Sequence, residues 1–432
     1  MTQRRRNVVF LAMPAVILLA GLVWLELRQE PAARADQPVT LVFTHAKHPR
    51  YAFLSRLIRQ FEDEHPGIRV REQILPASTD EQHQFYIMNL PAGGGDTDLI
   101  DMDIIWVPEF ARAGWLMELT PHLREEELAP LNPGALRADR LEGRLYAVPW
   151  FVDAGVLYYR KDLLDKYGFT PPETYPELLA QAKHILAGER DPRLSGFLWQ
   201  GMQYEGLVCS ALEFIRGNGG DVLGEDQRPA LGSPNAQEAL TFMSRLVRGE
   251  GVTPALVTTL NEEASRHIFQ SGRAVFMRNW PYAWRLMQQP DSAVQGRVGM
   301  RLVPHFPGHA SAPTMGGFHL GVNSASPHRK EALQFLRYMI RYSAQKEILL
   351  KVGVLAAHMQ VYEDAEVRAA LPFLPDLLPA LEQAQPRPVT PYYLMISQVL
   401  QPELSAVVAG IRTPGEAMRL ADEQIARVLE AQ

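Results

Sequence analysis

The sequence predicts an α/β protein with two sizeable domains, and two observations support that prediction. Patterns typical of strands and helices alternate from about residue 40 to the C-terminus, which favours sheets of largely parallel strands. The chain has 432 residues, too many for one average domain, and 47% of them are hydrophobic, enough for two cores. We therefore expect two α/β domains within one chain.

The N-terminal part of the first domain reads as strand, helix, strand. Residues 40–44 form a short apolar run, and residues 54–61 repeat apolar side chains at helical spacing. Pro66 and Gly67 end that helix, and apolar residues then alternate with polar ones over residues 68–74, which is typical of a strand. Residues 98–106 predict a buried strand, and Pro108 lies in the first turn of a helix that follows.

The middle of the chain predicts a crossing between domains. Two apolar strands flank Pro149, and Trp150, Phe151 and Asp153 lie at the bend. We expect helices over residues 175–186, 204–216 and 233–248, and a final helix that begins at Thr413 with a capping-box pattern. The proline-rich residues 371–393 are interpreted as an irregular excursion.

The first 35 residues predict an export signal. Three arginines at positions 4–6 precede an apolar run over residues 7–25, and Ala33 and Ala35 favour cleavage before Asp36. The alternative is an uncleaved membrane anchor, because the run approaches spanning length. We expect a periplasmic protein.

Charge and cysteine content exclude several classes of partner and site. The formal charge is -6, and -9 without residues 1–35, which argues against nucleic acid and anionic membranes as partners. Cys209 is the only cysteine, so no intramolecular disulfide forms, and we interpret it as a buried inert thiol. The 12 histidines show no metal-binding spacing, and the glycine-rich residues 92–96 lack the lysine of a phosphate loop. We expect no metal and no cofactor.

The stretch FMRNWPYAW, residues 276–284, predicts a binding pocket. Trp280 and Tyr282 offer flat aromatic faces beside the hydrogen-bonding side chains of Arg278 and Asn279. Asn279 is expected to cap a helix, with Pro281 in the first turn. The alternative is that Trp280 and Trp284, four residues apart, are core residues on one helix face. We prefer the core for Trp284 and the pocket for Trp280.

Two aspartates are candidates for accepting hydrogen bonds from a ligand. Asp103 lies near the C-terminal end of a predicted strand, where open α/β sheets bind ligands, and Asp153 follows the bend at Pro149. Either aspartate could instead serve a helix cap or a turn. Asp101 and Asp103 lie roughly 6.5 Å apart on one face of the strand, close to the spacing of inverting glycosidases. Since catalytic carboxylates must flank the scissile bond and these two would approach a substrate from the same side, we favour binding without turnover.

These stretches, together with DMDIIWVPEFARAGWL, VPWFVDAGVLYYRKDLL, WQGMQYEGLVCSALEF and GGFHLGVN, resemble the family 1 extracellular solute-binding proteins of ABC importers. Within that family the chain resembles the trehalose/maltose-binding group. The resemblance implies a two-lobed, type II-like periplasmic binding protein fold with a ligand cleft at the hinge. We expect one lobe from residues 40–150 and 299–328, and the other from residues 151–298 and 329–432.

The resemblance also implies a set of binding residues. Asp103, Asp153, Trp280 and Tyr282 match sugar-contacting positions, and Tyr204, Gly317 and Arg387 match further ones. The sequence departs from the family pattern at Phe318, where tryptophan is frequent, at Gln82, where arginine can occur, and near His45 and His48, where an acidic group can occur. The substrate-binding set that we expect is Gln82, Asp103, Phe151, Asp153, Tyr204, Trp280, Tyr282, Gly317, Phe318 and Arg387.

The function implied is a monomeric periplasmic receptor that closes on a neutral saccharide, such as trehalose or maltose, and delivers it to a membrane permease. The alternatives are another cargo, namely a polyol, a glycerophosphodiester or a polyamine, and a secreted glycoside hydrolase.

Overall fold

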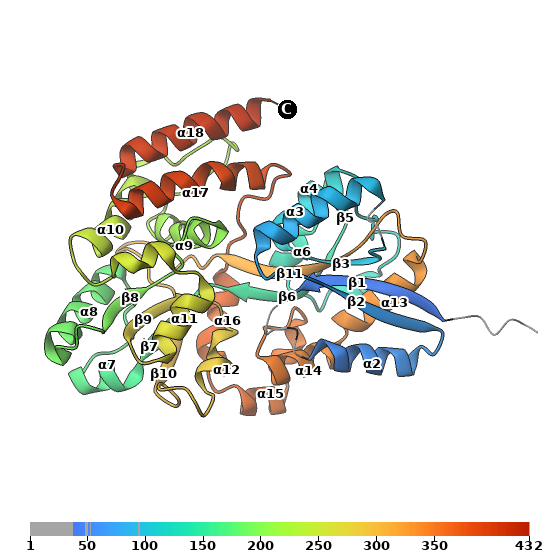
Figure 1. Ribbon diagram of the computed structural model, residues 1–432, viewed down its shortest axis with the longest axis horizontal. Helices are drawn as coiled ribbons and strands as arrows, with labels where there is room; N and C mark the ends of the chain where they lie inside the picture. The colour runs from blue at the N-terminus through green and yellow to red at the C-terminus, as the bar shows by residue number, and fades with distance from the viewer. Residues whose placement is uncertain (1–37, 48–50, 52, 94–95, 432) are drawn as a thin grey trace, which may run out of the picture.

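The protein is described here from a computed structural model, which places residues 38–47, 51, 53–93 and 96–431 (Figure 1). The predicted export signal, with its proposed cleavage site before Asp36, lies outside these residues, as does His48. Two sheets form the centres of two lobes, and the chain passes between the lobes near the middle of the molecule (Figure 1).

The first lobe is built on a five-stranded sheet of order β2-β1-β3-β11-β6. Its strands are β1 (Val39–Ala46), β2 (Ile68–Leu75), β3 (Leu99–Asp103), β6 (Val148–Ala154) and β11 (Met315–Val322). All of the side chains of β3, β6 and β11 are buried, because helices cover both faces of the sheet. The strands and helix expected over residues 40–74 are confirmed.

The second lobe is built on a four-stranded sheet of order β10-β7-β9-β8. Its strands are β7 (Val156–Arg160), β8 (Ser195–Leu198), β9 (Ala274–Asn279) and β10 (Val298–Leu302). Only Gly155 separates β6 of the first sheet from β7 of the second, so the expected crossing between lobes lies at Gly155. The expected bend at Pro149 is wrong: Pro149 lies within β6, together with Trp150, Phe151 and Asp153, because an edge strand can accommodate a proline.

The prediction of largely parallel sheets is wrong. β1 pairs in parallel with β2 and β3, and β8 with β9. However, β11 is antiparallel to both β3 and β6, and β7 is antiparallel to both β9 and β10. The reason is the path of the chain: β11 returns from the second lobe and enters the first sheet between two strands that run the other way.

Helices cover both sheets. Those packed around the first sheet are α2 (Leu54–Glu64), α3 (Thr79–Asn89), α4 (Val107–Arg112), α6 (Pro133–Ala138), α13 (Arg329–Ile340), α14 (Tyr342–Val352) and α15 (Ala365–Ala370). Those on the side of the second sheet are α7 (Lys161–Tyr167), α8 (Tyr175–Glu189), α9 (Glu205–Arg216), α10 (Pro234–Arg248), α11 (Glu262–Gln270), α12 (Ala283–Met287), α17 (Tyr393–Ala409) and α18 (Pro414–Glu430). A short helix, α5 (Glu125–Leu128), and the hairpin of β4 (Arg140–Leu141) and β5 (Arg144–Leu145) lie in the connection before β6.

Three of the expected lobe boundaries differ from the structure. Residues 151–154 lie in β6 and so belong to the first sheet, although they were assigned to the second lobe. β10 begins at Val298 and pairs with β7, so residues 299–302 belong to the second sheet and the chain returns to the first between residues 303 and 314. α13 contacts β1, β6 and β11, so residues 329–340 pack on the first lobe although they were assigned to the second. The sequence pattern showed the elements but did not show which sheet each one covers.

Three chain segments meet where the lobes join. The amide of Gly155 donates to the carbonyl of Thr314 at 3.1 Å, and the amide of Met315 donates to the carbonyl of Gln385 at 2.8 Å. The amide of Gln385 in turn donates to the carbonyl of Pro313 at 2.9 Å. The crossing segments are therefore tied to one another by backbone hydrogen bonds.

The proline-rich residues 371–393 contain a helix, which corrects the interpretation as an irregular excursion. This helix, α16 (Leu374–Gln383), has a proline in its first turn and Pro379 inside, and it contacts β6 and β10 from the two sheets. None of the helices in the described residues is long and apolar enough to cross a membrane.

Candidate ligand-binding site

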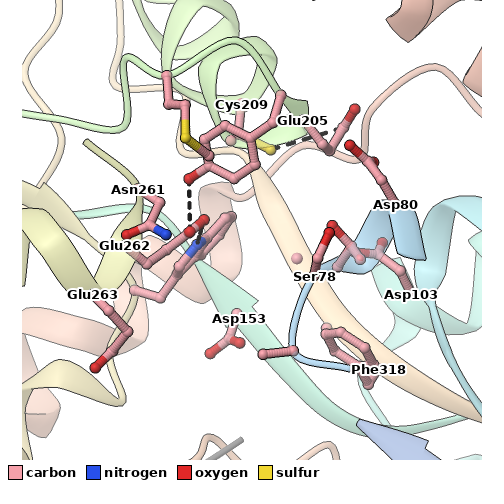
Figure 2. A pocket seen from close by; sticks show the side chains of 18 of the residues that line it. Ser78, Asp80, Asp103, Asp153, Glu205, Cys209, Asn261, Glu262, Glu263 and Phe318 are labelled. Carbon is pink, nitrogen blue, oxygen red and sulfur yellow. Dashed lines mark hydrogen bonds between the residues drawn. The ribbon is translucent and has the colours of Figure 1, made fainter. Parts of the chain in front are cut away.

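A cavity of about 410 Å³ lies between the two lobes (Figure 2). Eight of the ten expected binding residues line it, and they come from both lobes and from the crossings: Asp103, Asp153, Tyr204, Trp280, Tyr282, Gly317, Phe318 and Arg387. Gln82 and Phe151 do not line it.

The loop before α3 forms part of the first-lobe wall. Ala77, Ser78, Thr79 and Asp80 line the cavity there. Gln82 is buried below this loop and donates from Nε2 to the carbonyls of Pro76 at 3.0 Å and of Ala77 at 3.1 Å. Gln82 therefore holds the shape of the loop, and its place as a direct lining residue is corrected.

Asp103 ends β3 at the edge of the cavity and has two partners. Its Oδ1 accepts from the amide of Ile105 at 3.2 Å, so the side chain caps the 3-10 turn Ile104–Trp106. The same oxygen accepts from Nη2 of Arg387 at 2.8 Å. Among the described residues nothing donates a hydrogen bond to Oδ2 of Asp103, so this oxygen is the one available to a ligand hydroxyl. Asp103 therefore both caps this 3-10 turn and lines the cavity.

The floor of the cavity is formed by β6 and β11. Asp153 pairs with Gly316 across these strands, and Gly317 and Phe318 follow. Gly317 has a φ of 140°, and a Cβ atom there would lie 2.5 Å from the carbonyl oxygen of Phe151, so only glycine fits. Phe151 stacks on Phe318 with 5.5 Å between ring centroids, and thus supports a lining residue from below.

A turn after β9 presents Trp280 and Tyr282. Asn279 is the last residue of β9 and does not cap α12, which corrects the expected N-cap. Its side chain instead fixes the turn: Oδ1 accepts from the amide of Trp280 at 2.8 Å, and Nδ2 donates to the carbonyl of Glu262 at 3.0 Å. Tyr158 donates its hydroxyl to the carbonyl of Trp280 at 2.9 Å. The turn is therefore held on both sides.

A buried ion pair lies behind Trp280. Nη2 of Arg278 is 2.6 Å from Oε1 of Glu213, and Nε is 2.8 Å from Oε2. Although burial opposes the charge of Arg278, Glu213 holds the pKa of the guanidinium above its ordinary value. Glu213 also accepts from the amide of Thr314 on the crossing at 3.2 Å. Glu213 thus connects Arg278 of β9 to the crossing segment.

Two glutamates at the start of α11 also line the cavity and were not predicted. Glu262 accepts from the hydroxyl of Tyr204 at 2.6 Å, and Glu263 accepts from the hydroxyl of Tyr282 at 2.6 Å. Arg266 pairs with Glu263 at 2.6 Å. In the sequence, NEEA reads only as an N-cap followed by acidic residues at a helix N-terminus. No local signal shows that this helix end meets the start of α9.

Arg387 joins the two lobes at one end of the cavity. Nη2 contacts Asp103 of the first lobe at 2.8 Å, and Nη1 contacts Glu205 of α9 at 2.9 Å. Tyr393 and Ser397 of α17 also donate to Glu205. Burial alone would lower the pKa of Arg387, but Asp103 and Glu205 hold it well above its ordinary value, so Arg387 stays charged.

Several other residues from the sequence analysis are placed as follows. Cys209 is buried, and burial raises the pKa of its thiol to about 12. Trp284 packs on Phe373 with 4.6 Å between ring centroids and does not line the cavity. Asp101 accepts from Tyr51 and does not line the cavity either, so the carboxylate pair considered for hydrolysis does not face the space together. In the described ranges, no group of three or more His, Cys, Asp or Glu side chains could hold a metal ion.

The cavity combines aromatic faces with an excess of carboxylates. Of the described residues that line it, six are acidic and one, Arg387, is basic; the acidic ones are Asp80, Asp103, Asp153, Glu205, Glu262 and Glu263 (Figure 2). Carboxylates accept hydrogen bonds from hydroxyl and ammonium groups, whereas phosphate needs donors. This arrangement suits a ligand rich in hydrogen-bond donors with flat apolar faces.

Comparison with known proteins agrees with this geometry. A family model described as bacterial extracellular solute-binding protein matches residues 45–346. A probable ABC transporter-binding protein of Deinococcus radiodurans is 35% identical over 369 residues, which cover 84% of this chain and 87% of that protein. A putative binding protein of Brucella abortus is 26% identical over 417 residues, which cover 93% of this chain and 95% of that protein.

Solved structures share the fold. The maltose-bound MalE3 of T. maritima superposes with a TM-score of 0.85 at 37% identity, covering 91% of this chain and 100% of that one. A solute-binding protein of Thermotoga lettingae bound with α-D-tagatose has a TM-score of 0.82 at 26% identity, and the match covers 90% of this chain and 100% of that one. The two-lobed fold expected from the sequence is thereby confirmed.

Proposed function

Because this chain belongs to the family of bacterial extracellular solute-binding proteins, we propose that it is the substrate-binding component of an ABC importer for a neutral saccharide of about disaccharide size. The observation that supports the cargo is the cavity of about 410 Å³ between the lobes, with Trp280 and Tyr282 beside several carboxylates. That volume is in the ordinary range for small-molecule sites, roughly 300–1,000 Å³. The 37% identical MalE3 with bound maltose makes maltose the first candidate.

The mechanism follows from the two-sided lining. Trp280 would stack on a pyranose face from the second lobe, while Asp103 of the first lobe would accept hydrogen bonds from hydroxyl groups. A ligand that touches both lobes only when they are closed favours the closed state by that difference in contacts. The closed, loaded form would then dock on the permease in the membrane, with the receptor acting as a monomer in the periplasm.

The test is calorimetric titration of the purified protein with maltose, trehalose, sucrose and sorbitol, with Trp280→Ala as the variant. Saturable one-to-one binding of a disaccharide that the variant loses supports the proposal. Heat with sorbitol and none with the disaccharides would replace the cargo with a polyol. Incubation with each bound disaccharide and assay for free glucose tests the absence of turnover, and released glucose would overturn it.

A cationic cargo is the second candidate, because the lining has six carboxylates and one guanidinium among the described residues. Arg387 is shared by Asp103 and Glu205, and Arg266 pairs with Glu263, so part of the negative charge is neutralised. Rings beside the remaining carboxylates would suit an ammonium group. Titration with spermidine tests this, and binding that falls steeply with added salt would favour the cation over the saccharide. A glycerophosphodiester is disfavoured because its phosphate would meet these carboxylates.

A further inference from the structure

Glu262 joins two aromatic residues of the cavity wall that come from different elements. Its Oε2 accepts from the hydroxyl of Tyr204, the residue before α9, at 2.6 Å. Its Oε1 lies 3.5 Å from Nε1 of Trp280, the residue after β9. Dashed lines in Figure 2 mark both contacts to the labelled Glu262. One carboxylate therefore contacts both rings.

The position of Glu262 is itself fixed by its surroundings. Asn261 caps α11 by accepting from the amide of Ala264 at 2.9 Å, so the first turn of this helix is well defined. The carbonyl of Glu262 accepts from Nδ2 of Asn279, the residue before Trp280. The helix end and the aromatic turn are thus connected through the main chain as well as through the carboxylate.

Tyr204 depends on this contact for its direction. Its ring folds back over the start of α9, where a Cβ atom at Gly206 would lie 2.2 Å from the phenolic oxygen. Glycine at 206 therefore leaves room for this orientation, in which the hydroxyl reaches Glu262. Burial, together with the negative charge of Glu262, raises the pKa of Tyr204 well above its ordinary value, so the phenol keeps its proton and remains the donor.

We propose that Glu262 is a positioning residue that holds Tyr204 and Trp280 in the orientations that bind the ligand. This inference rests on the proposed saccharide-binding function, and it adds a determinant that the sequence resemblance does not assign. Two rings held at fixed angles are preorganised for stacking, so the ligand does not have to order them when it binds.

Two substitutions at this position separate orientation from charge. Glu262→Ala removes both contacts, and we expect maltose affinity to fall about 10- to 100-fold. Glu262→Gln keeps them: its amide oxygen accepts from Trp280, and its amide nitrogen donates to the Tyr204 oxygen, which can also accept. We expect Glu262→Gln to bind within about threefold of wild type. Equal losses in both variants would overturn the positioning role, because they would assign the effect to the charge.

Tyr204→Phe removes the same hydrogen bond by deleting its donor, and it replaces Glu262→Ala in the affinity measurement if Glu262→Ala does not fold. If Glu262→Ala does fold, the two variants can also be combined. In a double-mutant cycle, Tyr204→Phe should weaken binding in the wild type and have little further effect in the Glu262→Ala background. Fully additive effects would contradict the proposal. Glu177→Ala is the matched control, because Glu177 also lies in the first turn of a helix of the second lobe but is exposed and lines no part of the cavity.

A fluorine NMR measurement on the ligand-free protein tests the positioning role separately from the proposed function. In protein labelled with 5-fluorotryptophan, the Trp280 resonance, assigned by its loss in Trp280→Phe, should shift in Glu262→Ala and stay in place in Glu262→Gln and Glu177→Ala. A wild type that binds no saccharide, with this pattern of shifts intact, would overturn the proposed function and leave the positioning role standing. Unchanged maltose affinity and an unchanged resonance in Glu262→Ala would overturn the positioning role alone.

Discussion

The guanidinium of Arg278 lies over the indole of Trp280, with 4.1 Å from its Cζ to the ring centroid. Because Arg278 is paired with Glu213, and Glu213 accepts from the amide of Thr314 on a crossing segment, Trp280 rests on a buried group that also touches the hinge. The aromatic face is therefore supported by a charge-neutral base that water does not reach. Arg278, near the end of β9, thus supports the indole of the residue two positions further along the chain.

We expect Trp280→Ala to weaken saccharide binding by at least about 2 kcal/mol, or about 30-fold, because it removes the stacking face at the centre of the site. Calorimetric titration with maltose measures this. Trp284→Ala is the control: Trp284 packs on Phe373 away from the cavity, so its loss should lower the melting temperature while leaving the affinity nearly unchanged. The reverse pattern would place the ligand elsewhere.

Gly155→Ala is expected to destabilise the protein by about 1–3 kcal/mol, because a Cβ atom there would lie 1.8 Å from Oε1 of the buried Glu213. Urea unfolding measures the loss. For comparison, Gly67→Ala adds the same methyl group where nothing lies within 4 Å, and it should be close to neutral. If both variants unfolded at the same urea concentration as wild type, the tight packing beneath the crossing would be refuted.

Cys209 is expected to resist thiol reagents in the folded protein. Burial raises the pKa of its thiol to about 12, against about 8.5 for a free cysteine, so near pH 8 the reactive thiolate is on the order of a thousandfold less populated. Labelling with a chromogenic disulfide should be slow in the native protein and fast in denaturant. Because Cys209 also lines the cavity, native labelling at the rate of a free thiol would show that the reagent reaches it through that space.

The pair of Glu72 and His45 predicts a pH-dependent contribution to stability. The hydrogen bond to His45, at 3.2 Å, holds the pKa of Glu72 below the ordinary value of 4.5, although partial burial acts in the opposite direction. A carboxyl with a lowered folded-state pKa stabilises the protein above its unfolded pKa and loses that contribution as the pH falls through the folded value.

Wild type should therefore exceed Glu72→Gln in free energy of unfolding by a few tenths of a kcal/mol up to about 1 kcal/mol at neutral pH. The difference should shrink below about pH 4.5. Chemical unfolding at a series of pH values checks it, and an advantage that grows toward acid would have the wrong sign for this pairing.

The sequence predicted local elements well because their signals are local. The apolar spacing of residues 54–61 gives α2, and Thr413 with Glu416 gives the capping box of α18. Pro375 and Pro379 misled the interpretation of residues 371–393, because a proline in the first turn fits a helix and a later one was tolerated within α16.

Non-local relationships could not be predicted in the same way. Eight of ten expected binding residues line the cavity, and the resemblance, not the spacing, identified most of them. Glu205, Glu262 and Glu263 were missed because their position in the cavity depends on where two helix N-termini meet in space. Gln82 and Phe151 were expected to line the cavity, but both lie one layer behind it and support the residues that do.

The place of β11 in the first sheet has a consequence for biosynthesis. Since β11 lies between β3 and β6, a ribosome that has made residues 1–302 has produced a complete set of strands for the second sheet and an incomplete set for the first. Until residue 322 emerges, β3 has one unpaired edge and β6 lacks its partner strand in the sheet, and unpaired strand edges are the kind of surface on which nascent chains associate wrongly. Folding of the first lobe therefore waits for a late segment, which prolongs the time during which a newly made chain needs chaperones.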